Sequence, residues 1–290
     1  MNIQKSYQNQ SQDIGELYIV PTPIGNLEDI TYRALKTLEN ADMIAAEDTR
    51  QTKKLMSHFE LHTPLVSYHE HNKLDKESYL IEEIQSGKTL AVVSDAGMPG
   101  VSDPGFELVN RAIQEGIHVI VLPGANAALC ALVGSGLNTD RFYFYGFLPR
   151  KKKERKEELE ALYRMTSTLI FYESPHRLKE VVKSIHEVMG NRQVALAREL
   201  TKKYEEYVRG SAEEIVEWAQ QNEIRGEFCI IVEGNEESEP QGEELWWAAF
   251  SLTEHVEHYV DEGQSSKDAI KQVAKDRKMP KREVYQAYHT

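Results

Sequence analysis

The sequence predicts two α/β domains followed by a small helical module that resembles a helix-turn-helix. Its 290 residues are about twice the length of a typical single domain. Short apolar runs of β-type residues alternate with helical stretches, and this alternation begins again near residue 142. We therefore expect a disordered tail over residues 1–14, α/β domains over 15–124 and 125–236, and an acidic linker with the helical module over 237–290.

Strands of the first domain are expected where apolar runs end in Gly, Pro or polar residues. These runs cover residues 17–20, 43–46, 65–68, 90–94 and 118–122, with helices near 30–39, 76–86 and 104–115. Asp103 is the expected N-cap of the third helix, because Pro104 suits its first position and Gly116 follows its end. Residues 1–13 are polar and aperiodic, which predicts the disordered tail.

The second domain begins with a helical, small-residue stretch over residues 125–136. Its expected strands are 142–147, 168–172, 193–197, 205–209 and 227–232, with helices near 153–164, 175–189 and 211–220. After the linker, Ser265 and Ser266 are expected to cap a helix over 267–275, and Pro280 opens a last helix that runs through 288. This pair of short helices resembles a helix-turn-helix.

Composition excludes several classes of protein. With 40% apolar and 28% charged residues, the chain is an ordinary globular protein rather than a disordered or fibrous one. No apolar run approaches the roughly 18 residues of a membrane span, and the polar start has no signal-peptide pattern, so we expect a cytoplasmic protein without a membrane partner. Cys130 and Cys229 each stand among apolar residues, which predicts two buried thiols and neither a disulfide nor a metal site.

Charges are unevenly distributed along the chain. The net charge of −13 argues against indiscriminate binding to polyanions. Residues 264–290 nevertheless carry seven Lys or Arg against three acids, and residues 150–156 hold six cations. Each run alone is more often a solvated face than a binding site, but two basic clusters in different domains would suit a multi-point grip on RNA.

The unusual residues follow the expected strands, where open α/β sheets bind ligands. The loop 95–105 holds three glycines and two prolines, which indicates either a backbone that closely approaches a ligand or a structural turn before a helix. Neither a dinucleotide fingerprint nor a phosphate-binding Gly-Lys-Ser/Thr loop occurs. His69 and His71 would point the same way on an extended strand, but two ligands do not make a site, so no metal is expected.

Several segments in order carry a family resemblance: 22–31, 46–50, 68–72, 94–100, 102–105, 146–150, 172–177 and 197–202. Together they resemble the tetrapyrrole methylase superfamily, and within it the branch of 16S ribosomal RNA cytidine 2′-O-methyltransferases. The resemblance covers residues 15–290. The family usually has Pro-Gly-Pro-Ser-Ala where this chain has Pro-Gly-Ala-Asn-Ala at 123–127, and often Thr in place of Met98. These departures affect side-chain contacts with the cofactor more than main-chain contacts.

The resemblance implies a fold, a cofactor and a substrate. It implies two α/β domains with S-adenosylmethionine in the cleft between them, a homodimer, and a C-terminal module for RNA. The implied reaction is 2′-O-methylation of a cytidine in small-subunit 16S ribosomal RNA. The cofactor-binding residues implied are Pro23, Asp95, Ala96, Gly97, Pro99, Gly100, Ser102, Asp103, Pro123, Gly124, Ala125, Ala127, Ala128, Phe147, Leu148 and Ala197.

Methyl transfer from a sulfonium needs no metal, because the methyl group is already activated. A ribose hydroxyl is a poor nucleophile, so a nearby base is expected, and the candidates are Glu47, Asp48, Glu173 and His176. The carboxylates, like those of Asp103 and Glu199, can equally cap a helix or pair with an arginine. The expected RNA-binding residues are Arg50, Arg150, Lys151, Lys152, Lys153, Arg177, Arg198, Lys281 and Arg282.

Two other functions remain as alternatives. The nearer one is a methyltransferase of the same superfamily that acts on a tetrapyrrole, although such an enzyme would need neither basic cluster. The more distant one is a DNA-binding regulator that uses the terminal helix pair, in which the two α/β domains would have no role.

Overall fold

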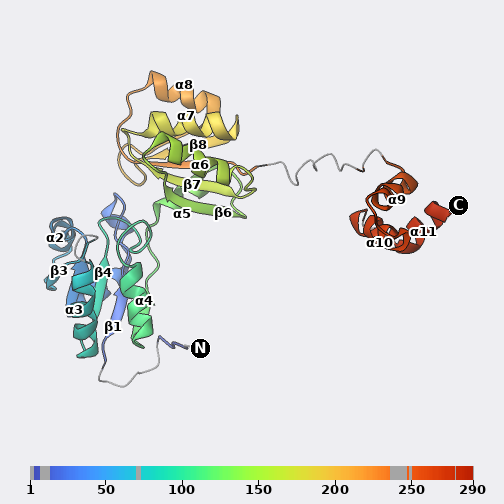
Figure 1. Cartoon of the computed structure of the whole chain (residues 1–290). Coiled ribbons are helices and arrows are strands. Elements are labelled where there is room, and N and C mark those ends of the chain that lie inside the picture. The colour runs from blue at the N-terminus through green and yellow to red at the C-terminus, as the bar shows by residue number, and fades with distance from the viewer. Residues whose placement is uncertain are drawn as a thin grey trace. The chain divides into compact units, whose positions relative to one another are not determined.

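A computed structural model gives the fold of the chain (Figure 1) and describes residues 3–6, 14–69, 73–235, 247, 250–277 and 279–289. The chain separates into one unit of residues Met1–Asn235, which holds two sheets, and a second unit of Glu236–Thr290, which holds helices α9, α10 and α11. Among the described helices, none has both the length and the apolar character needed to cross a bilayer.

The first sheet has five parallel strands in the order β3-β2-β4-β1-β5. Helices α1 and α2 pack on one face and helices α3 and α4 on the other, so the central strand β4 is buried along its whole length. The elements are β1 (Glu16–Ile19), η1 (Leu27–Asp29), α1 (Tyr32–Asn40), β2 (Met43–Ala46), α2 (Thr49–His58), β3 (Leu65–Ser67), α3 (Lys73–Gln85), β4 (Leu90–Val93), α4 (Phe106–Gln114) and β5 (His118–Val121).

Strands β1 and β4 are neighbours, but the chain leaves them in opposite directions. It runs from β1 toward β2 on one side and from β4 toward β5 on the other. Such a switch point leaves a crevice at the carboxyl ends of the strands. The two loops are joined there, because the Thr22 N–H donates to the Gly97 carbonyl (3.0 Å) and the Gly97 N–H donates to the Thr22 carbonyl (2.9 Å).

The second sheet is mixed, with strand order β6-β7-β10-β8-β9. Strands β6 and β7 are parallel, whereas β10 runs antiparallel to both β7 and β8. Helices α6, α7 and α8 cover one face, and α5 covers part of the other (Figure 1). The elements are α5 (Ala127–Ser135), β6 (Phe142–Phe147), α6 (Lys152–Leu162), β7 (Thr168–Glu173), α7 (Leu178–Met189), β8 (Gln193–Arg198), β9 (Glu206–Ser211), α8 (Ala212–Gln221) and β10 (Phe228–Val232).

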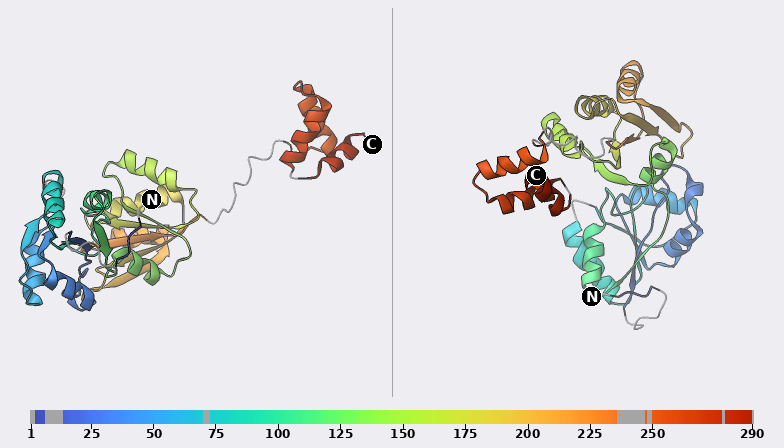
Figure 2. Two further views of the ribbon diagram at one scale, coloured as in Figure 1. Left: turned by 90° about the horizontal axis from the view of Figure 1, so that it is seen from below. Right: turned by 90° about the vertical axis from the view of Figure 1, so that its right-hand side faces the viewer.

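The second unit is a bundle of α9 (Leu252–Asp261), α10 (Ser266–Asp276) and α11 (Lys281–His289), seen from two sides in Figure 2. Its core contains Val256, Ile270 and Val284, one from each helix. The Ser265 side chain caps α10 by accepting a hydrogen bond from the Asp268 N–H (3.2 Å), as the sequence predicts.

Two expectations from the sequence are wrong. Helix α4 begins at Phe106, and its N-cap is Gly105 rather than Asp103; no side-chain hydrogen bond caps it. The helix starts late because the loop folds back on itself, so that a Cβ on Gly105 would lie 3.2 Å from the Gly100 nitrogen. The thiol of Cys130 is exposed, because α5 buries the stripe of Ala128, Ala131, Leu132 and Ser135 instead.

Candidate active site

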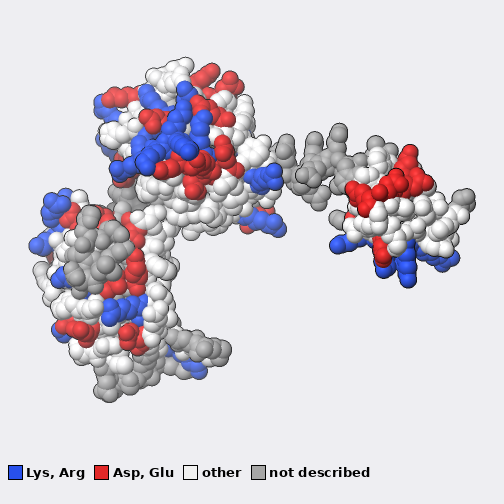
Figure 3. Space-filling model, in the orientation of Figure 1, with Lys and Arg blue, Asp and Glu red and all other residues white. Residues whose placement is uncertain are grey.

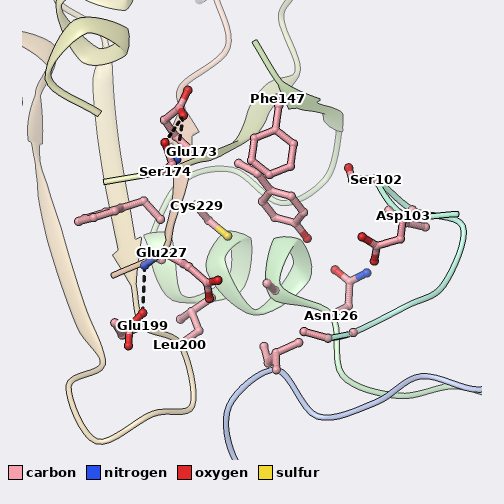
Figure 4. A pocket seen from close by; sticks show the side chains of 18 of the residues that line it. Ser102, Asp103, Asn126, Phe147, Glu173, Ser174, Glu199, Leu200, Glu227 and Cys229 are labelled. Carbon is pink, nitrogen blue, oxygen red and sulfur yellow. Dashed lines mark hydrogen bonds between the residues drawn. The ribbon is translucent and has the colours of Figure 1, made fainter. Parts of the chain in front are cut away.

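A cavity of about 440 Å³ lies at the switch-point crevice, between the loops of the first sheet and the second sheet (Figure 4). Its volume is within the range of small-molecule sites. The first-sheet loops contribute Ile24, Ala96, Gly97, Met98, Val101, Ser102 and Asp103, and the start of α5 contributes Asn126 and Ala127. The second sheet contributes Phe147, Tyr172, Glu173, Ser174, Pro175, Ala197, Glu199, Leu200, Lys202, Glu227, Phe228 and Cys229.

The cavity brings together part of the expected cofactor site. Its lining includes the expected residues Ala96, Gly97, Ser102, Asp103, Ala127, Phe147 and Ala197. The other expected residues lie outside the lining: Pro23, Asp95, Pro99, Gly100, Pro123, Gly124, Ala125, Ala128 and Leu148. Leu148 is buried in the core under α6 and α7, and the Ala128 N–H donates to the Tyr172 hydroxyl (3.2 Å).

Sequence reasoning missed most of the wall formed by the second sheet. It followed only the carboxyl ends of strands, whereas antiparallel β10 brings its beginning to the same edge: Phe228 pairs with Glu173 at the end of β7 and with Arg198 at the end of β8. Phe228 and Cys229 therefore line the cavity from a strand of ordinary core residues. The available signals were two segments that carry the family resemblance: 172–177, which supplies Tyr172, Ser174 and Pro175, and 197–202, which supplies Leu200 and Lys202.

Three carboxylates lie near the edge of the first sheet. Burial raises the pKa of Glu47, and the Asp95 carboxylate raises it further. Burial, followed by repulsion from Glu47 and Asp95, raises the pKa of Asp103 to about 6, against a hydrogen bond from the Ser94 side chain. Of the three, only Asp103 lines the cavity, and Figure 4 shows its carboxylate beside Asn126 and pointing inward.

Asp48 has a structural role at the start of α2. Its carboxylate accepts the Arg50 N–H (2.8 Å) and pairs with the Arg50 guanidinium (Nη2 to Oδ2, 2.7 Å). The hydrogen bond from the Arg50 side chain lowers the pKa of Asp48 to about 2. Asp48 is thus a poor proton acceptor, and neither it nor Glu47 is a lining residue.

Glu173 lines the cavity but is held by its neighbours. Its carboxylate accepts the Ser174 N–H (2.7 Å) and lies 3.3 Å from the Arg177 guanidinium, and burial raises its pKa against these contacts. The Arg177 guanidinium also donates to the carbonyls of Leu148 (2.8 Å) and Pro149 (3.2 Å), so it faces the protein interior rather than a partner. His176 is exposed and does not line the cavity.

Lys202 joins the second sheet to the first at the cavity wall. Its ammonium contacts the carboxylates of Glu199 (3.0 Å) and Glu227 (2.9 Å). Burial alone would lower the pKa of Lys202, but hydrogen bonds to these two carboxylates raise it above its ordinary value, so the ammonium stays charged. The Lys202 stem lies against Gly25 in the loop after β1, where a Cβ would be 2.4 Å from Lys202 Cγ. A glycine at that position therefore permits the contact between the two halves.

The basic run before and within α6 divides into exposed and buried cations. Arg150, Lys151, Lys152 and Lys153 are exposed, although Lys151 pairs with Glu154 (2.8 Å). The side chain of Arg155, by contrast, is only 2% exposed and donates to Ser184 Oγ (3.1 Å) and to the Arg150 carbonyl (3.2 Å). Cations and carboxylates lie side by side over this half of the molecule in Figure 3.

The other residues expected to contact RNA differ in whether their charges are already paired within the protein. The Arg50 guanidinium is exposed but paired with Asp48. Arg198 donates to the Arg225 carbonyl (2.7 Å) and pairs with Glu206 (3.0 Å). Lys281 and Arg282 are exposed on α11, in a bundle whose cations and carboxylates gather on opposite sides in Figure 3.

The structure describes only one of the two histidines considered as metal ligands, His69. Glu70 and His71 lie outside the described residues. Throughout the part of the chain that the structure describes, no group of three or more His, Cys, Asp or Glu residues is arranged to hold a metal ion.

Charge and polarity of the lining define the kind of ligand it suits. Among the described lining residues, four carboxylates (Asp103, Glu173, Glu199 and Glu227) stand against the single ammonium of Lys202, and most of the others are apolar. Glu173 pairs with Arg177, and Glu199 and the largely exposed Glu227 share the Lys202 ammonium, so the carboxylates still outnumber the cations beside them. Because such an excess of negative charge favours a compensating positive charge, the cavity suits a cationic molecule that also has apolar surface.

Comparisons with known proteins agree with this architecture. Residues 16–216 match the family of Tetrapyrrole (Corrin/Porphyrin) Methylases. Among solved structures of similar fold, cobalt precorrin-4 methyltransferase has a TM-score of 0.57 and 19% identity, covering 75% of this chain and 94% of that one. The uroporphyrin-III C-methyltransferase of Thermus thermophilus complexed with S-adenosyl homocysteine has a TM-score of 0.54 and 19% identity, covering 76% of this chain and 97% of that one.

Much closer relatives match the chain from end to end. The ribosomal RNA small subunit methyltransferase I of Halalkalibacterium halodurans is 59% identical over 290 residues, covering 100% of this chain and 99% of the relative. The protein of the same name from Bacillus subtilis is 57% identical over 281 residues, covering 97% of this chain and 96% of the relative. The chain therefore belongs to the tetrapyrrole methylase family and, within it, to the group of ribosomal RNA small subunit methyltransferases I.

Proposed function

We propose that this chain transfers a methyl group from S-adenosylmethionine to the 2′-hydroxyl of a cytidine ribose in 16S ribosomal RNA. The observation that carries the proposal is the acid-rich cavity at the switch point, in a chain that is 59% identical over its whole length to a ribosomal RNA small subunit methyltransferase I. The substrate is RNA rather than a tetrapyrrole, because the relatives with that name share the entire chain, including the helical module.

The cavity fits the proposed cofactor in both charge and surface. S-adenosylmethionine supplies a sulfonium-activated methyl group, whose bond to sulfur breaks with its electron pair going to sulfur. The carboxylate of Asp103, for which the described residues offer no ion-pair partner, would compensate a cationic ligand, and Met98, Phe147 and Leu200 would offer apolar surface to an adenine ring. By closing around the ligand, these residues would orient the methyl group and exclude water.

RNA would bind through exposed cations outside the cavity. Arg150, Lys152 and Lys153 in one unit and Lys281 and Arg282 in the other carry exposed charge. Cations of this kind bind RNA through its phosphates, so the affinity for RNA should fall steeply as the salt concentration rises. Arg177 is not included, because its guanidinium holds main-chain carbonyls within the protein.

Methyl transfer to ribosomal subunits tests the reaction. Radiolabelled S-adenosylmethionine would be incubated with the full chain and small ribosomal subunits from a strain that lacks the gene, and ribose methylation would be mapped on the product. We expect label at a ribose 2′ position of one cytidine. Precorrin-type tetrapyrroles in parallel provide the control, and label on these alone would refute the RNA substrate.

Calorimetry tests the cofactor site without any turnover. Ala127→Trp places an indole in the cavity and should weaken S-adenosyl homocysteine binding by at least about tenfold, whereas Asn110→Trp on the exposed side of α4 should leave it unchanged. Equal binding by both variants would place the cofactor elsewhere.

A homodimer is also part of the proposal. Helix α5 leaves Leu129 and Val133 exposed, Val133 by 75%, and such apolar side chains favour a protein contact. Sedimentation should therefore give twice the chain mass for the wild type and the monomer mass for Val133→Glu. A monomer mass for the wild type would refute the proposed homodimer but not the proposed reaction.

A further inference from the structure

The loop between β8 and β9, residues 199–205, leaves the cavity wall through an unusual backbone. Glu199 and Thr201 have φ of +50° and +66°, in the left-handed region that residues with a side chain rarely adopt. Figure 4 shows Glu199 and Leu200 on this loop at the wall of the cavity. Backbone strain of this kind is concentrated at functional sites, so the loop is a candidate for more than a connection between two strands.

Hydrogen bonds hold the loop in one conformation. The Lys202 N–H donates to the Glu199 carbonyl (3.0 Å), and the Glu205 N–H donates to the Lys202 carbonyl (3.1 Å). The Glu205 carboxylate reaches back to accept the Thr201 N–H (2.6 Å). The Lys202 ammonium fixes the loop to the sheet through Glu199 and Glu227. The backbone at the tip of the loop is therefore held in place before a ligand binds, which lowers the cost of ordering it.

The tip of the loop presents an aromatic ring to solvent. Tyr204 is 68% exposed, and the Lys203 ammonium lies over its ring, 5.5 Å from the centroid. Among the described residues, no other ring stacks on Tyr204, and no carboxylate pairs with Lys203. The ring and the ammonium are therefore both available to a ligand.

The carboxylates that follow Tyr204 are directed to partners within the protein. Glu205 accepts the Thr201 N–H, and Glu206 pairs with the Arg198 guanidinium (3.0 Å). The charge beside the ring that remains unpaired in the described part of the chain is thus positive, which suits a ligand with negative charge.

The ring also lies close to the cavity. Tyr204 is two residues beyond Lys202, which lines the cavity, so their Cα atoms are at most about 7.6 Å apart. A strand of RNA that brings a ribose to the cavity across this wall carries the neighbouring bases past Tyr204. Proteins commonly hold unpaired RNA by stacking its bases on aromatic rings and placing cations against its phosphates.

We propose that Tyr204 and Lys203 form a docking point for RNA at the rim of the cavity, an assignment that rests on the proposed function. The Tyr204 ring stacks on the base of a nucleotide next to the methylated cytidine, and the Lys203 ammonium contacts a phosphate of the same strand. Because a stacked base of this kind is splayed out of its helix, the docking point selects an unpaired segment over a regular duplex. It thereby positions the target ribose at the cavity.

Binding of small ribosomal subunits tests the role of the ring. Subunits from a strain that lacks the gene would be titrated with the full chain in a filter assay. We expect Tyr204→Ala to weaken binding by at least about tenfold, whereas Tyr204→Phe, which keeps the ring, should stay within about threefold of the wild type. Tyr79→Ala is the matched control and should bind like the wild type. Tyr79 is also exposed and has Lys76 over its ring (5.3 Å), but it lies on α3 and does not line the cavity.

The salt dependence of the same binding separates the ring from the cation. Lys203→Gln should lower the slope of log affinity against log salt concentration by about 0.7, the value for one phosphate on a single strand, and Tyr204→Ala should leave that slope unchanged. Both variants should bind S-adenosyl homocysteine within about threefold of the wild type in calorimetry, because neither side chain lines the cavity.

Three results would overturn the assignment. One is binding of subunits by Tyr204→Ala within about threefold of the wild type, and another is an equal loss for Tyr204→Ala and Tyr204→Phe, which would assign the effect to the hydroxyl. The third is sedimentation of Tyr204→Ala at half the mass of the wild type, which would make the ring a contact between two copies of the chain. Absence of methyl transfer to RNA by the wild type would instead remove the proposed function, and it is recognised before any variant is compared.

Discussion

Replacing Asp103 by Asn should stabilise the fold at neutral pH, because the native site makes ionisation of this carboxyl unfavourable. The folded chain holds the Asp103 proton up to about pH 6, whereas an unfolded chain releases it near the ordinary value of 3.8. As pH rises between these values the unfolded state loses its proton first, so the carboxyl lowers the stability of the folded state. Asparagine does not ionise and removes this loss.

The size of the effect follows from the same pKa values. Each pKa unit corresponds to about 1.4 kcal/mol, so a rise from 3.8 to about 6 sets an upper limit of about 3 kcal/mol. Part of the side chain is in contact with solvent, and relaxation reduces the effect, so about 1–2 kcal/mol is expected at pH 7.5. Near pH 4 the folded carboxyl is protonated and the unfolded one only about half ionised, so the gain should fall below about 1 kcal/mol.

Urea denaturation of the full chain measures this difference. The midpoint for Asp103→Asn should lie above that of the wild type at about pH 7.5, and the two midpoints should converge at about pH 4. Ser86→Asn at an exposed position provides a control that should show no pH-dependent difference. A variant that is less stable than the wild type at both pH values, or a gain that is the same at both, would refute the reasoning.

Three further predictions test other parts of the structure. A thiol reagent should label Cys130 but not Cys229 in the native chain, because burial raises the pKa of the Cys229 thiol to about 12; labelling should vanish in Cys130→Ser. Arg155→Ala should cost about 2–4 kcal/mol in urea denaturation, whereas Lys152→Ala should leave stability unchanged and reduce the salt dependence of RNA binding in a filter assay. Gly97→Ala, at φ +82° and with a Cβ 3.3 Å from Ile24, should cost about 1–2 kcal/mol by the same denaturation and weaken S-adenosyl homocysteine in calorimetry.

Much of the fold could be predicted because its strands are continuous apolar runs. The run 43–46 matches β2, and 142–147 matches β6. Helix α2 was missed, because Thr49–His58 is mostly polar and buries only Thr52 and Met56. The Cys130 error has the opposite cause: in the uniformly apolar segment Ala-Leu-Cys-Ala-Leu, periodicity does not tell which face is buried.

The candidate site was less predictable than the fold, since it depends on contacts between distant segments. A loop rich in Gly and Pro is visible in the sequence, and the loop 95–105 does reach the cavity. The sequence does not show that the stem of Lys202, far along the chain, packs against Gly25. It also does not show that Arg155, which belongs to a run of cations, is buried and donates a hydrogen bond to Ser184. In each case the deciding factor is tertiary packing, which local pattern does not encode.

Several costs to stability meet at one turn of the first sheet, and this concentration argues for function rather than accident. Helix α4 begins without a side-chain cap, Ser102 adopts a left-handed backbone, and the Asp103 carboxyl ionises against repulsion from its neighbours. Each feature alone costs of order 1 kcal/mol or more. A turn selected for stability alone would use Asp103 as the cap and remove all three costs together. Because the cost is retained where the carboxylate faces a cavity suited to a cation, the turn is better explained as a means of holding a charged carboxylate at the wall of that cavity.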